Sequence, residues 1–167
     1  SERFDESSNL TERFAAYRIA RSDGSEELSE RLSNNFLASA ETDEVLDLWL
    51  STEAMNESTA TIDRLHELMS HERFAWTNPN RVRAVLGTFA NRNVRAFHTP
   101  EGYRLLADAV LKLDAMNPQI ASRLVMPLCQ WARFTEQYQA AMKAELRRMA
   151  AKDLSKDLDE IVSKSVD

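Results

Sequence analysis

The sequence predicts an all-α protein, an irregular α-solenoid or superhelix built from stacked antiparallel helical hairpins. Apolar residues recur at helical spacing from end to end, as Leu28, Leu32 and Phe36 do. The chain holds only 3 Gly and 4 Pro in 167 residues, which is too few for a turn-rich β protein. No segment alternates apolar and polar residues in the manner of a half-buried strand.

Breaks in the apolar pattern divide the chain into about nine helices joined by short loops, an arrangement of HEAT/armadillo type. The breaks fall at positions 23–24, 40–42, 56–58, 70–78, 91–93, 98–100, 116–117, 134–135 and 152–155. Polar side chains at the ends of these breaks are expected to cap the next helix: Ser25, Thr42, Ser58, Asn78, Thr99, Asn117, Thr135 and Asp153. Short connections favour antiparallel neighbours, so the helices are expected to pair as hairpins.

Two Asn-Pro steps, Asn78-Pro79 and Asn117-Pro118, predict the most sharply placed helix starts. Proline at the first helical position loses no intrahelical bond, and the preceding Asn can cap free N–H groups. The steps lie 117 minus 78, or 39, residues apart, close to the ~40–47 period of helix-pair repeats. Farther along, Pro127 is expected to kink or split the second of these helices.

Each Asn-Pro step is followed, little more than one turn later, by an arginine: Arg83 in the first unit and Arg123 in the second. If the units stack in register, both guanidinium groups can project from one surface and suit a carboxylate through bidentate hydrogen bonds. The alternative is a solvated basic face with surface ion pairs of little value. That face would also include Arg81, Arg92, Arg95, Arg104 and Arg133.

Composition bounds the class of protein. A formal net charge of -6 argues against a general binder of nucleic acid or anionic membranes. No run approaches the roughly 20 apolar residues of a membrane span, and no secretion signal opens the chain. The single cysteine, Cys129, lies in an apolar run and is expected to be a buried structural thiol in a reducing compartment. We therefore expect a cytoplasmic protein.

We expect one helical domain over residues 1–167. The chain begins at Ser1 without an initiator Met, and its first eight residues are polar or charged apart from Phe4. Residues 1–8 are accordingly expected to be disordered or left from the preparation of a fragment, and a fragment of a longer protein is expected.

Local motifs for catalysis are weak. His66 and His71 flank a glutamate as in a zinc-protease helix, but a spacing of five residues turns the second ring by roughly 140° from the first. His98 stands before Thr99-Pro100 and is expected to be a loop or capping residue. Aspartates and glutamates fall on the solvent sides of the apolar stripes, and the three tryptophans are expected to be packing anchors. Neither an autonomous active site nor a metal site is expected.

The most specific residues form a collinear set: Asn78-Pro79-Asn80-Arg81-Val82-Arg83, Phe89-Ala90, Ala96-Phe97-His98, Asn117-Pro118-Gln119-Ile120-Ala121-Ser122-Arg123-Leu124 and Met126-Pro127-Leu128. Together they closely resemble the C-terminal end of bacterial aminopeptidase N, a zinc metallopeptidase of the thermolysin-like (gluzincin) aminopeptidase family. The resemblance extends from Asn9-Leu10-Thr11-Glu12-Arg13 to Leu154-Ser155-Lys156-Asp157-Leu158, and positions 18–53 match least specifically.

The resemblance implies that the chain is the distal half of the family's larger C-terminal helical domain, which packs over the catalytic domain and closes its active-site cavity. In that family an upstream domain binds zinc through His-Glu-x-x-His and a further glutamate, and holds the substrate amino terminus with Gly-x-Met-Glu-Asn. None of these motifs occurs in this chain. The chain is therefore expected to hold no cofactor and to be inactive alone, while the parent enzyme removes N-terminal amino acids from peptides.

The family also suggests a role for the two arginines. Arg83 and Arg123 match arginines that line the internal substrate cavity of these enzymes, and no catalytic or metal-binding residue is expected in the chain. The expected partners are the upstream catalytic domain of the same polypeptide and the peptide substrate, with neither nucleic acid nor membrane. Two alternatives remain open: a free-standing α-solenoid that binds a partner protein, and, disfavoured by spacing, a small metallopeptidase built on His66 and His71.

Overall fold

The computed structural model describes residues 9–23 and 26–166, so the expectations for residues 1–8 and for a cap at Ser25 lie outside the described residues. Helices dominate the described part of the chain, which contains no strand. Twelve α-helical segments, α2 to α13, are present in those residues, close to the expected number of about nine. The predicted all-α, armadillo-like class is confirmed by this architecture.

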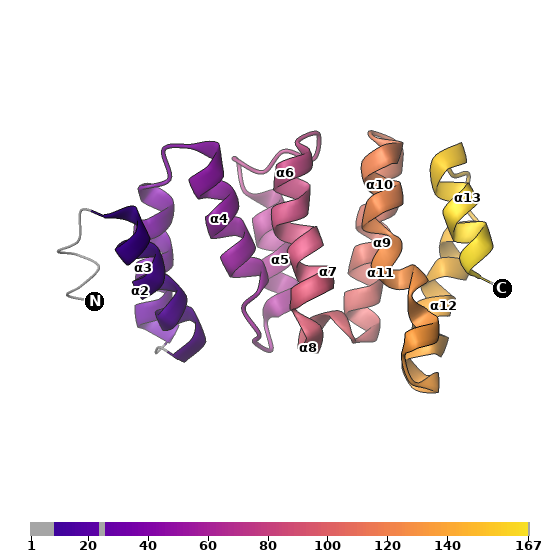
Figure 1. Ribbon diagram of the computed structural model, residues 1–167, viewed down its shortest axis with the longest axis horizontal. Coiled ribbons are helices and arrows are strands. Elements are labelled where there is room, and N and C mark those ends of the chain that lie inside the picture. The colour runs from indigo at the N-terminus through magenta and orange to yellow at the C-terminus, as the bar shows by residue number, and fades with distance from the viewer. Residues whose placement is uncertain (1–8, 24–25, 167) are drawn as a thin grey trace.

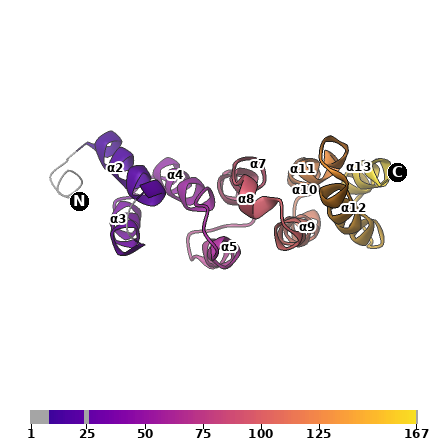
Figure 2. The same cartoon turned by 90° about the horizontal axis from the view of Figure 1, so that it is seen from below.

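The helices lie in two layers that follow the long axis of the molecule, with α2 and α13 at opposite ends (Figures 1 and 2). The first layer contains α2 (Leu10–Asp23), α4 (Asp43–Ala54), α6 (Pro79–Val82), α7 (Thr88–Arg92), α10 (Pro118–Leu124), α11 (Met126–Cys129) and α13 (Lys156–Ser165). The second layer contains α3 (Glu26–Ala38), α5 (Thr61–Ser70), α9 (Pro100–Asp114) and α12 (Glu136–Ala150). When α6 is taken with α7 and α10 with α11, successive helical units alternate between the layers, as stacked hairpins require.

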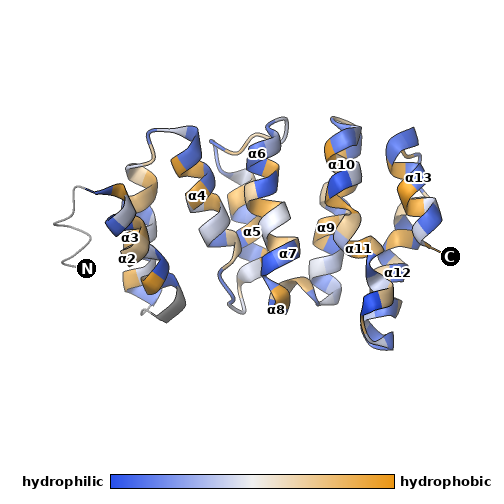
Figure 3. Cartoon of the chain, in the orientation of Figure 1, coloured by the Kyte–Doolittle hydropathy of each residue, from blue (hydrophilic) through white to orange (hydrophobic). Residues whose placement is uncertain are grey.

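Three short elements connect these helices. The four-residue helix α8 (Val94–Phe97) leads from α7 into α9, and a 3₁₀ turn (Trp131–Arg133) leads into α12. A π-turn (Arg83–Gly87) joins α6 to α7, so that the backbone is helical without a break from Pro79 to Arg92. Polar and apolar residues alternate along the helices (Figure 3), and the apolar sides pack between neighbouring helices in one core.

Most of the expected caps are present. Thr42 accepts from the Val45 amide and Thr99 from the Gly102 amide, at 3.4 and 3.0 Å. Thr135 occupies its cap position, but its side chain makes no capping bond. The caps at Asn78 and Asn117 are described with the site below.

Two expected caps were wrong. Helix α5 begins after Ala60, because the Thr61 hydroxyl and the backbone of Ser58 bond to each other in a separate turn. Helix α13 is capped by Ser155 in place of Asp153, since Ser155 is fixed by the buried Asp114, whose carboxylate accepts from its amide at 2.8 Å and from its hydroxyl. A local turn thus shifted the start of α5, and a tertiary contact shifted the start of α13.

Burial of Glu53 contradicts the expectation that carboxylates lie on solvent-facing sides. Its side chain is 1% exposed and accepts hydrogen bonds from Tyr17 at 2.5 Å, Ser33 at 2.8 Å and Arg64 at 2.9 Å, and from Arg21. Burial by itself raises the pKa of Glu53. The two guanidinium charges and the hydroxyl donors together lower the pKa by more than burial raises it, so the net shift is downward. This ionised carboxylate ties α2, α3, α4 and α5 together.

The tryptophans pack in or against the core as expected, whereas Cys129, which was expected to be buried, is only half-buried beside the core. Trp49 is 2% exposed and donates to Ser33 at 2.9 Å, while Lys112 and Lys143 lie 4.1 and 3.8 Å from the ring centres of Trp76 and Trp131. Burial raises the pKa of the Cys129 thiol, which disfavours the reactive thiolate. Within the described ranges, every helix lacks either the length or the apolar character of a membrane span.

Candidate functional site

Both Asn-Pro steps begin helices of the first layer, as predicted. Asn78 accepts from the Asn80 amide at 2.9 Å, and Asn117 accepts from the Ile120 amide at 3.2 Å. The prolines occupy the first turns of α6 and α10. The two caps fix where each helix starts and, through the helical repeat, the direction in which its arginine projects.

Arg83 and Arg123 border the same groove. It lies between the helix that runs from α6 to α7 and the helix pair α10 and α11, and it has a volume of about 200 Å³. We call it the arginine groove and define it by its lining: Pro79, Val82, Arg83, Gly87, Asn91, Ile120, Arg123, Leu124 and Pro127. Its place between consecutive first-layer helices follows from the stacking of the two Asn-Pro units.

The second wall of the arginine groove is shaped by a helix break. As expected, Pro127 splits the helix that begins at Pro118: α10 ends at Leu124 and α11 begins at Met126. Pro127, one helical turn after Arg123, lines the groove together with Leu124. The break therefore places an apolar ring beside the arginine.

The first wall contains the π-turn. The Thr88 amide donates to the Arg83 carbonyl, five residues back, which defines the wider turn. Gly87 lies directly under the Arg83 stem, because a Cβ built on Gly87 would approach the Arg83 Cγ to 3.3 Å. Asn91 continues the same wall and its amide donates to the Gly87 carbonyl at 2.8 Å. The absence of a side chain at Gly87 leaves room for the Arg83 stem along the groove wall.

The arginine groove is positively charged and its charges are free. Arg83 and Arg123 are exposed, and within the described part of the chain neither makes an ion pair or a side-chain hydrogen bond. No aspartate or glutamate lines the groove, although the whole chain carries 27 of them. The groove can therefore accept an anionic group without displacing an acidic neighbour.

Arg81 belongs to the same motif but has a structural role, which corrects its assignment to a solvated basic face. It is 4% exposed and donates to Asp43 at 2.6 Å, to Asp47 and to the backbone carbonyls of Arg73 and Asp43. These bonds attach α6 to α4. Of the three arginines in the two Asn-Pro units, only Arg83 and Arg123 are available to a ligand among the described residues.

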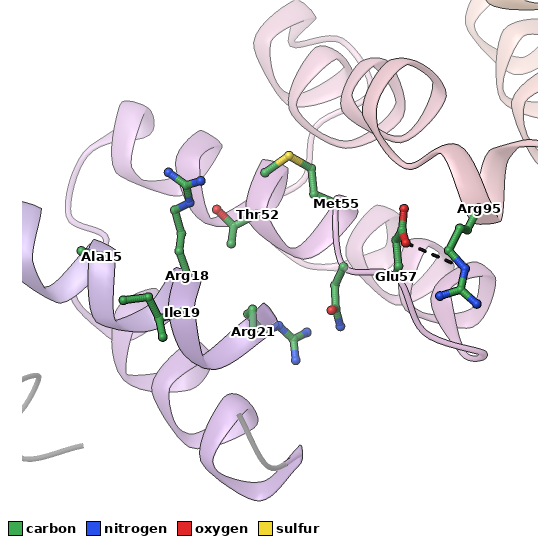
Figure 4. A pocket seen from close by; sticks show the side chains of 9 residues that line it. Ala15, Arg18, Ile19, Arg21, Thr52, Met55, Glu57 and Arg95 are labelled. Atoms are coloured by element: carbon green, nitrogen blue, oxygen red, sulfur yellow. Dashed lines mark ion pairs between the residues drawn. The ribbon is translucent and has the colours of Figure 1, made fainter. Parts of the chain in front are cut away.

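A larger cavity of about 660 Å³ lies beside α2 and the end of α4, and Figure 4 shows the residues around it. Its arginines already have partners: Arg21 bonds Glu53 and Ser29, and Arg95 lies 3.9 Å from Glu57 (dashed in Figure 4). Arg18 lies over the Phe14 ring. Because its cations are paired, this cavity is a weaker candidate for an anion site than the arginine groove.

The two histidines of the zinc-protease-like pattern lie in different settings. His66 is exposed on α5, whereas His71 follows the end of that helix with its ring 5.6 Å from Trp49. In residues 9–23 and 26–166 no group of three or more His, Cys, Asp or Glu side chains is placed to hold a metal ion.

His98 is more than the expected loop residue. Its Nδ1 lies 2.8 Å from the Tyr103 hydroxyl, and its ring lies 4.5 Å from Phe134 and 5.6 Å from Tyr138. Burial in this aromatic cluster lowers the pKa of His98 and raises the pKa of Tyr103 to about 12. The cluster joins the start of α9 to the start of α12 and has no group facing the arginine groove.

Sequence reasoning named the two arginines but missed the rest of the groove. The missed residues follow helical spacing: Arg83, Gly87 and Asn91 are four residues apart, as are Arg123 and Pro127. Residues at i and i+4 share one helix face. That spacing was available as a signal, whereas the π-turn was not, because no residue in the segment specifies it.

Comparisons with known proteins place this geometry in context. The family described as "Domain of unknown function (DUF3458_C) ARM repeats" matches residues 1–167. Aminopeptidase N of Haemophilus influenzae is 40% identical over 125 residues, which are 73% of this chain and 14% of that protein. Aminopeptidase N of Caulobacter vibrioides is 42% identical over 125 residues, again 73% of this chain and 14% of that protein.

Two further matches extend along nearly the whole chain. Aminopeptidase N of Escherichia coli is 31% identical over 176 residues, which are 99% of this chain and 19% of that protein. The crystal structure of Legionella pneumophila aminopeptidase A in complex with aspartic acid superimposes with a TM-score of 0.90 and 29% identity, covering 99% of this chain and 20% of that one. The chain thus spans 14–19% of these curated relatives. The resemblance to aminopeptidase N is confirmed.

Proposed function

The chain belongs to the DUF3458_C family of ARM repeats, and we propose that it caps the active-site cavity of an aminopeptidase N-type enzyme, where it restricts and positions peptide substrates. The observation that carries the proposal is the match of nearly the whole chain to about a fifth of a solved aminopeptidase. In this proposal the parent enzyme removes N-terminal amino acids from peptides in the cytoplasm, and its upstream catalytic domain holds the zinc ion.

The chain's own contribution would be enclosure and electrostatics. Arg83 and Arg123 would line the substrate cavity, where a charge is less screened than on an open surface. Their freedom from ion pairs in the described residues supports this role, because a paired arginine would first have to exchange its partner. Each guanidinium could strengthen peptide binding by about 1–3 kcal/mol.

The test uses the full enzyme and two kinds of substrate. Arg123→Ala should raise KM for longer peptides by about tenfold, the equivalent of 1.4 kcal/mol, and leave a single-residue chromogenic substrate nearly unchanged. A short substrate ends before it can reach the arginine. Arg92→Ala, which removes an exposed arginine of α7 outside the groove, is the matched control. Equal effects of Arg123→Ala on both substrates would contradict the cavity role.

Zinc binding gives a second test. Isothermal titration of the isolated chain with zinc should detect no stoichiometric, high-affinity site, and the isolated chain should not cleave aminoacyl substrates. A tight one-to-one site would contradict the proposal and would favour chemistry at His66 and His71.

A further inference from the structure

We infer that the chain contains a hinge at His98-Thr99, about which its two ends rotate relative to each other. The first body consists of residues 9–23 and 26–97, which hold α2 to α8, and the second body consists of residues 100–166, which hold α9 to α13. We call the boundary between the two bodies the seam. Each body would move as a rigid unit, and the seam would open or close between them.

Polar bonds tie the helical hairpins of the first body to one another. Glu53 on α4 accepts hydrogen bonds from α2, α3 and α5. Arg81 attaches α6 to α4 through two aspartates, and Asn93 donates to the Ala54 carbonyl at 3.0 Å, at the end of α4. Hydrogen bonds weaken steeply when their angles change, so these ties resist rotation of one hairpin against the next.

The second body is tied in the same way. Arg148 on α12 donates to Asp108 on α9 at 2.6 Å. The Ser155 amide at the start of α13 donates to Asp114 at the end of α9, at 2.8 Å. Trp131 donates from its indole nitrogen to a backbone carbonyl at the end of α13, at 2.6 Å. These bonds hold α9, α12 and α13 as one unit.

The seam differs from these interfaces in the part of the chain that the structure describes. There, neither an ion pair nor a hydrogen bond joins the first body to the second. The Lys112 ammonium lies 4.1 Å from the ring centre of Trp76, and the Phe97 and Tyr103 rings meet edge to face at 5.3 Å. Apolar packing in the shared core completes the boundary. Because apolar contact is non-directional, it permits a rotation that polar ties would resist.

Both layers are hollowed along the seam. On the first layer, the arginine groove of about 200 Å³ lies between the two bodies. On the second layer, a groove of about 370 Å³ lies between α5 and α9. The apolar part of its lining consists of Ile62, Met69, Trp76, Leu105 and Ala109. Side chains that fill a boundary completely would block movement, whereas these two hollows leave room for the bodies to tilt.

The connection between the bodies is short and closely packed. Helix α8 ends at Phe97 and α9 begins at Pro100, so only His98 and Thr99 lie between the two helices (Figure 1). Gly102 packs directly on the end of α8, since a Cβ at this position would stand 2.5 Å from the Phe97 carbonyl oxygen. Hinges are commonly a few residues at the ends of elements that absorb the change in backbone angles. Close packing here and hollows along the seam favour rotation about the connection.

The rotation would act on the arginine groove, because Arg83 belongs to the first body and Arg123 to the second. Opening of the seam would increase the distance between the two guanidinium groups, and closing would decrease it. With the proposed function, the same rotation would change the width of the substrate cavity. The hinge itself needs no assumption about function, since the polar ties and the hollows belong to this chain alone.

Distances between spin labels in the full enzyme test the hinge, in a background without other accessible cysteines. Asp63→Cys with Arg147→Cys spans the seam. Asp63→Cys with Glu27→Cys lies within the first body, and Arg104→Cys with Arg147→Cys lies within the second. All four positions are exposed, so the labels should not disturb the core. Double electron–electron resonance should give a distance distribution across the seam that is about twice as wide as that of either control pair.

The contact between Trp76 and Lys112 provides a variant that should loosen the seam. Lys112→Ala removes this contact, and Lys143→Ala removes the matching contact with Trp131 inside the second body. Lys112→Ala should raise the share of molecules with the longer distances across the seam by about two- to fivefold, as the loss of one exposed cation–π contact predicts. Lys143→Ala should leave that share unchanged. Lys112 is exposed, so its variant should fold normally.

Two results would contradict the inference in different ways. A distribution across the seam that is as narrow as those of both control pairs, in wild type and in Lys112→Ala, would overturn the hinge. A wide distribution on which Lys112→Ala and Lys143→Ala have the same effect would support the hinge but overturn the restraining role of the Trp76 contact. Neither result decides the cavity role, which the peptide kinetics of Arg123→Ala test separately.

Discussion

Arg81 and Arg83 lie two residues apart on one continuous helix, yet Arg81 is buried against Asp43 and Asp47 while Arg83 opens into the arginine groove. Helical geometry explains the difference, because residues two apart point to different faces. One short motif thus attaches its helix to α4 and at the same time presents a free guanidinium group.

Replacement of these two arginines should affect the stability of the fold to very different extents. Arg81→Ala should lower the free energy of unfolding by about 2–3 kcal/mol, because it removes several charge-assisted hydrogen bonds. Arg83→Ala should stay within about 0.5 kcal/mol of wild type. Urea denaturation of both variants measures the contrast, and similar losses in stability would refute the division of roles.

The buried Glu53 should be among the most sensitive positions of the N-terminal half. Glu53→Ala leaves the partly buried Arg21 and Arg64 without their shared carboxylate, at a cost of about 3–5 kcal/mol. Glu67, which is 64% exposed and also pairs with Arg64, provides the control. Glu67→Ala should cost less than about 1 kcal/mol in the same denaturation experiment. A loss as large as that of Glu53→Ala would contradict the importance of the buried carboxylate that Arg21 and Arg64 share.

Alanine substitutions at the two helical glycines that the structure describes, Gly102 and Gly87, should differ in their effect on stability. A Cβ at Gly102 would stand 2.3 Å from the Ala96 carbonyl oxygen and 2.5 Å from that of Phe97, where α9 crosses the end of α8. Gly102→Ala should therefore destabilise the protein by about 1–3 kcal/mol or more.

Gly87→Ala is the matched control for Gly102→Ala. It meets only the flexible Arg83 side chain and removes a glycine from a helix interior, so we expect a change between zero and a gain of about 1 kcal/mol. Thermal melting of the two variants checks that Gly102→Ala is the less stable. A larger loss at Gly87 would show that the Arg83 stem cannot move aside.

Stability should depend on pH through His98. Burial depresses its pKa in the folded state, so the unfolded chain binds the proton first as pH falls through the ordinary histidine value of about 6.5. The free energy of unfolding should therefore decrease between pH 7 and pH 5, by at most about 1.4 kcal/mol per pH unit for this one group.

Denaturation of His98→Gln across the same pH range isolates this contribution. In this variant the free energy of unfolding should fall less steeply between pH 7 and pH 5 than in wild type. An unchanged pH dependence would show that His98 makes no such contribution. The contribution of Glu53, whose folded pKa is lowered, is lost only at lower pH, below the ordinary glutamate value of about 4.3. The two groups can therefore be separated by pH.

Helix positions could largely be read from the chain because their signals are local. Asn78, Asn117 and Thr99 cap the helices they were expected to cap, and Pro127 splits its helix as predicted. The cap expected at position 58 is absent because the Thr61 hydroxyl bonds to Ser58 in a separate local turn. The cap expected at position 153 is absent because Asp114, 41 residues before Ser155, binds Ser155 in a contact that no local pattern contains.

Local signals in the chain specify the all-helical class, the Asn-Pro helix starts and the repeated placement of Arg83 and Arg123, because caps, prolines and apolar spacing act over a few residues. Which arginines remain free depends instead on how the helices pack. Arg81 is neutralised by Asp43 and Asp47, 38 and 34 residues away, and Glu53 collects donors from three other helices. Such long-range pairing depends on how the hairpins stack, and it is what separates a structural arginine from one that can meet a ligand.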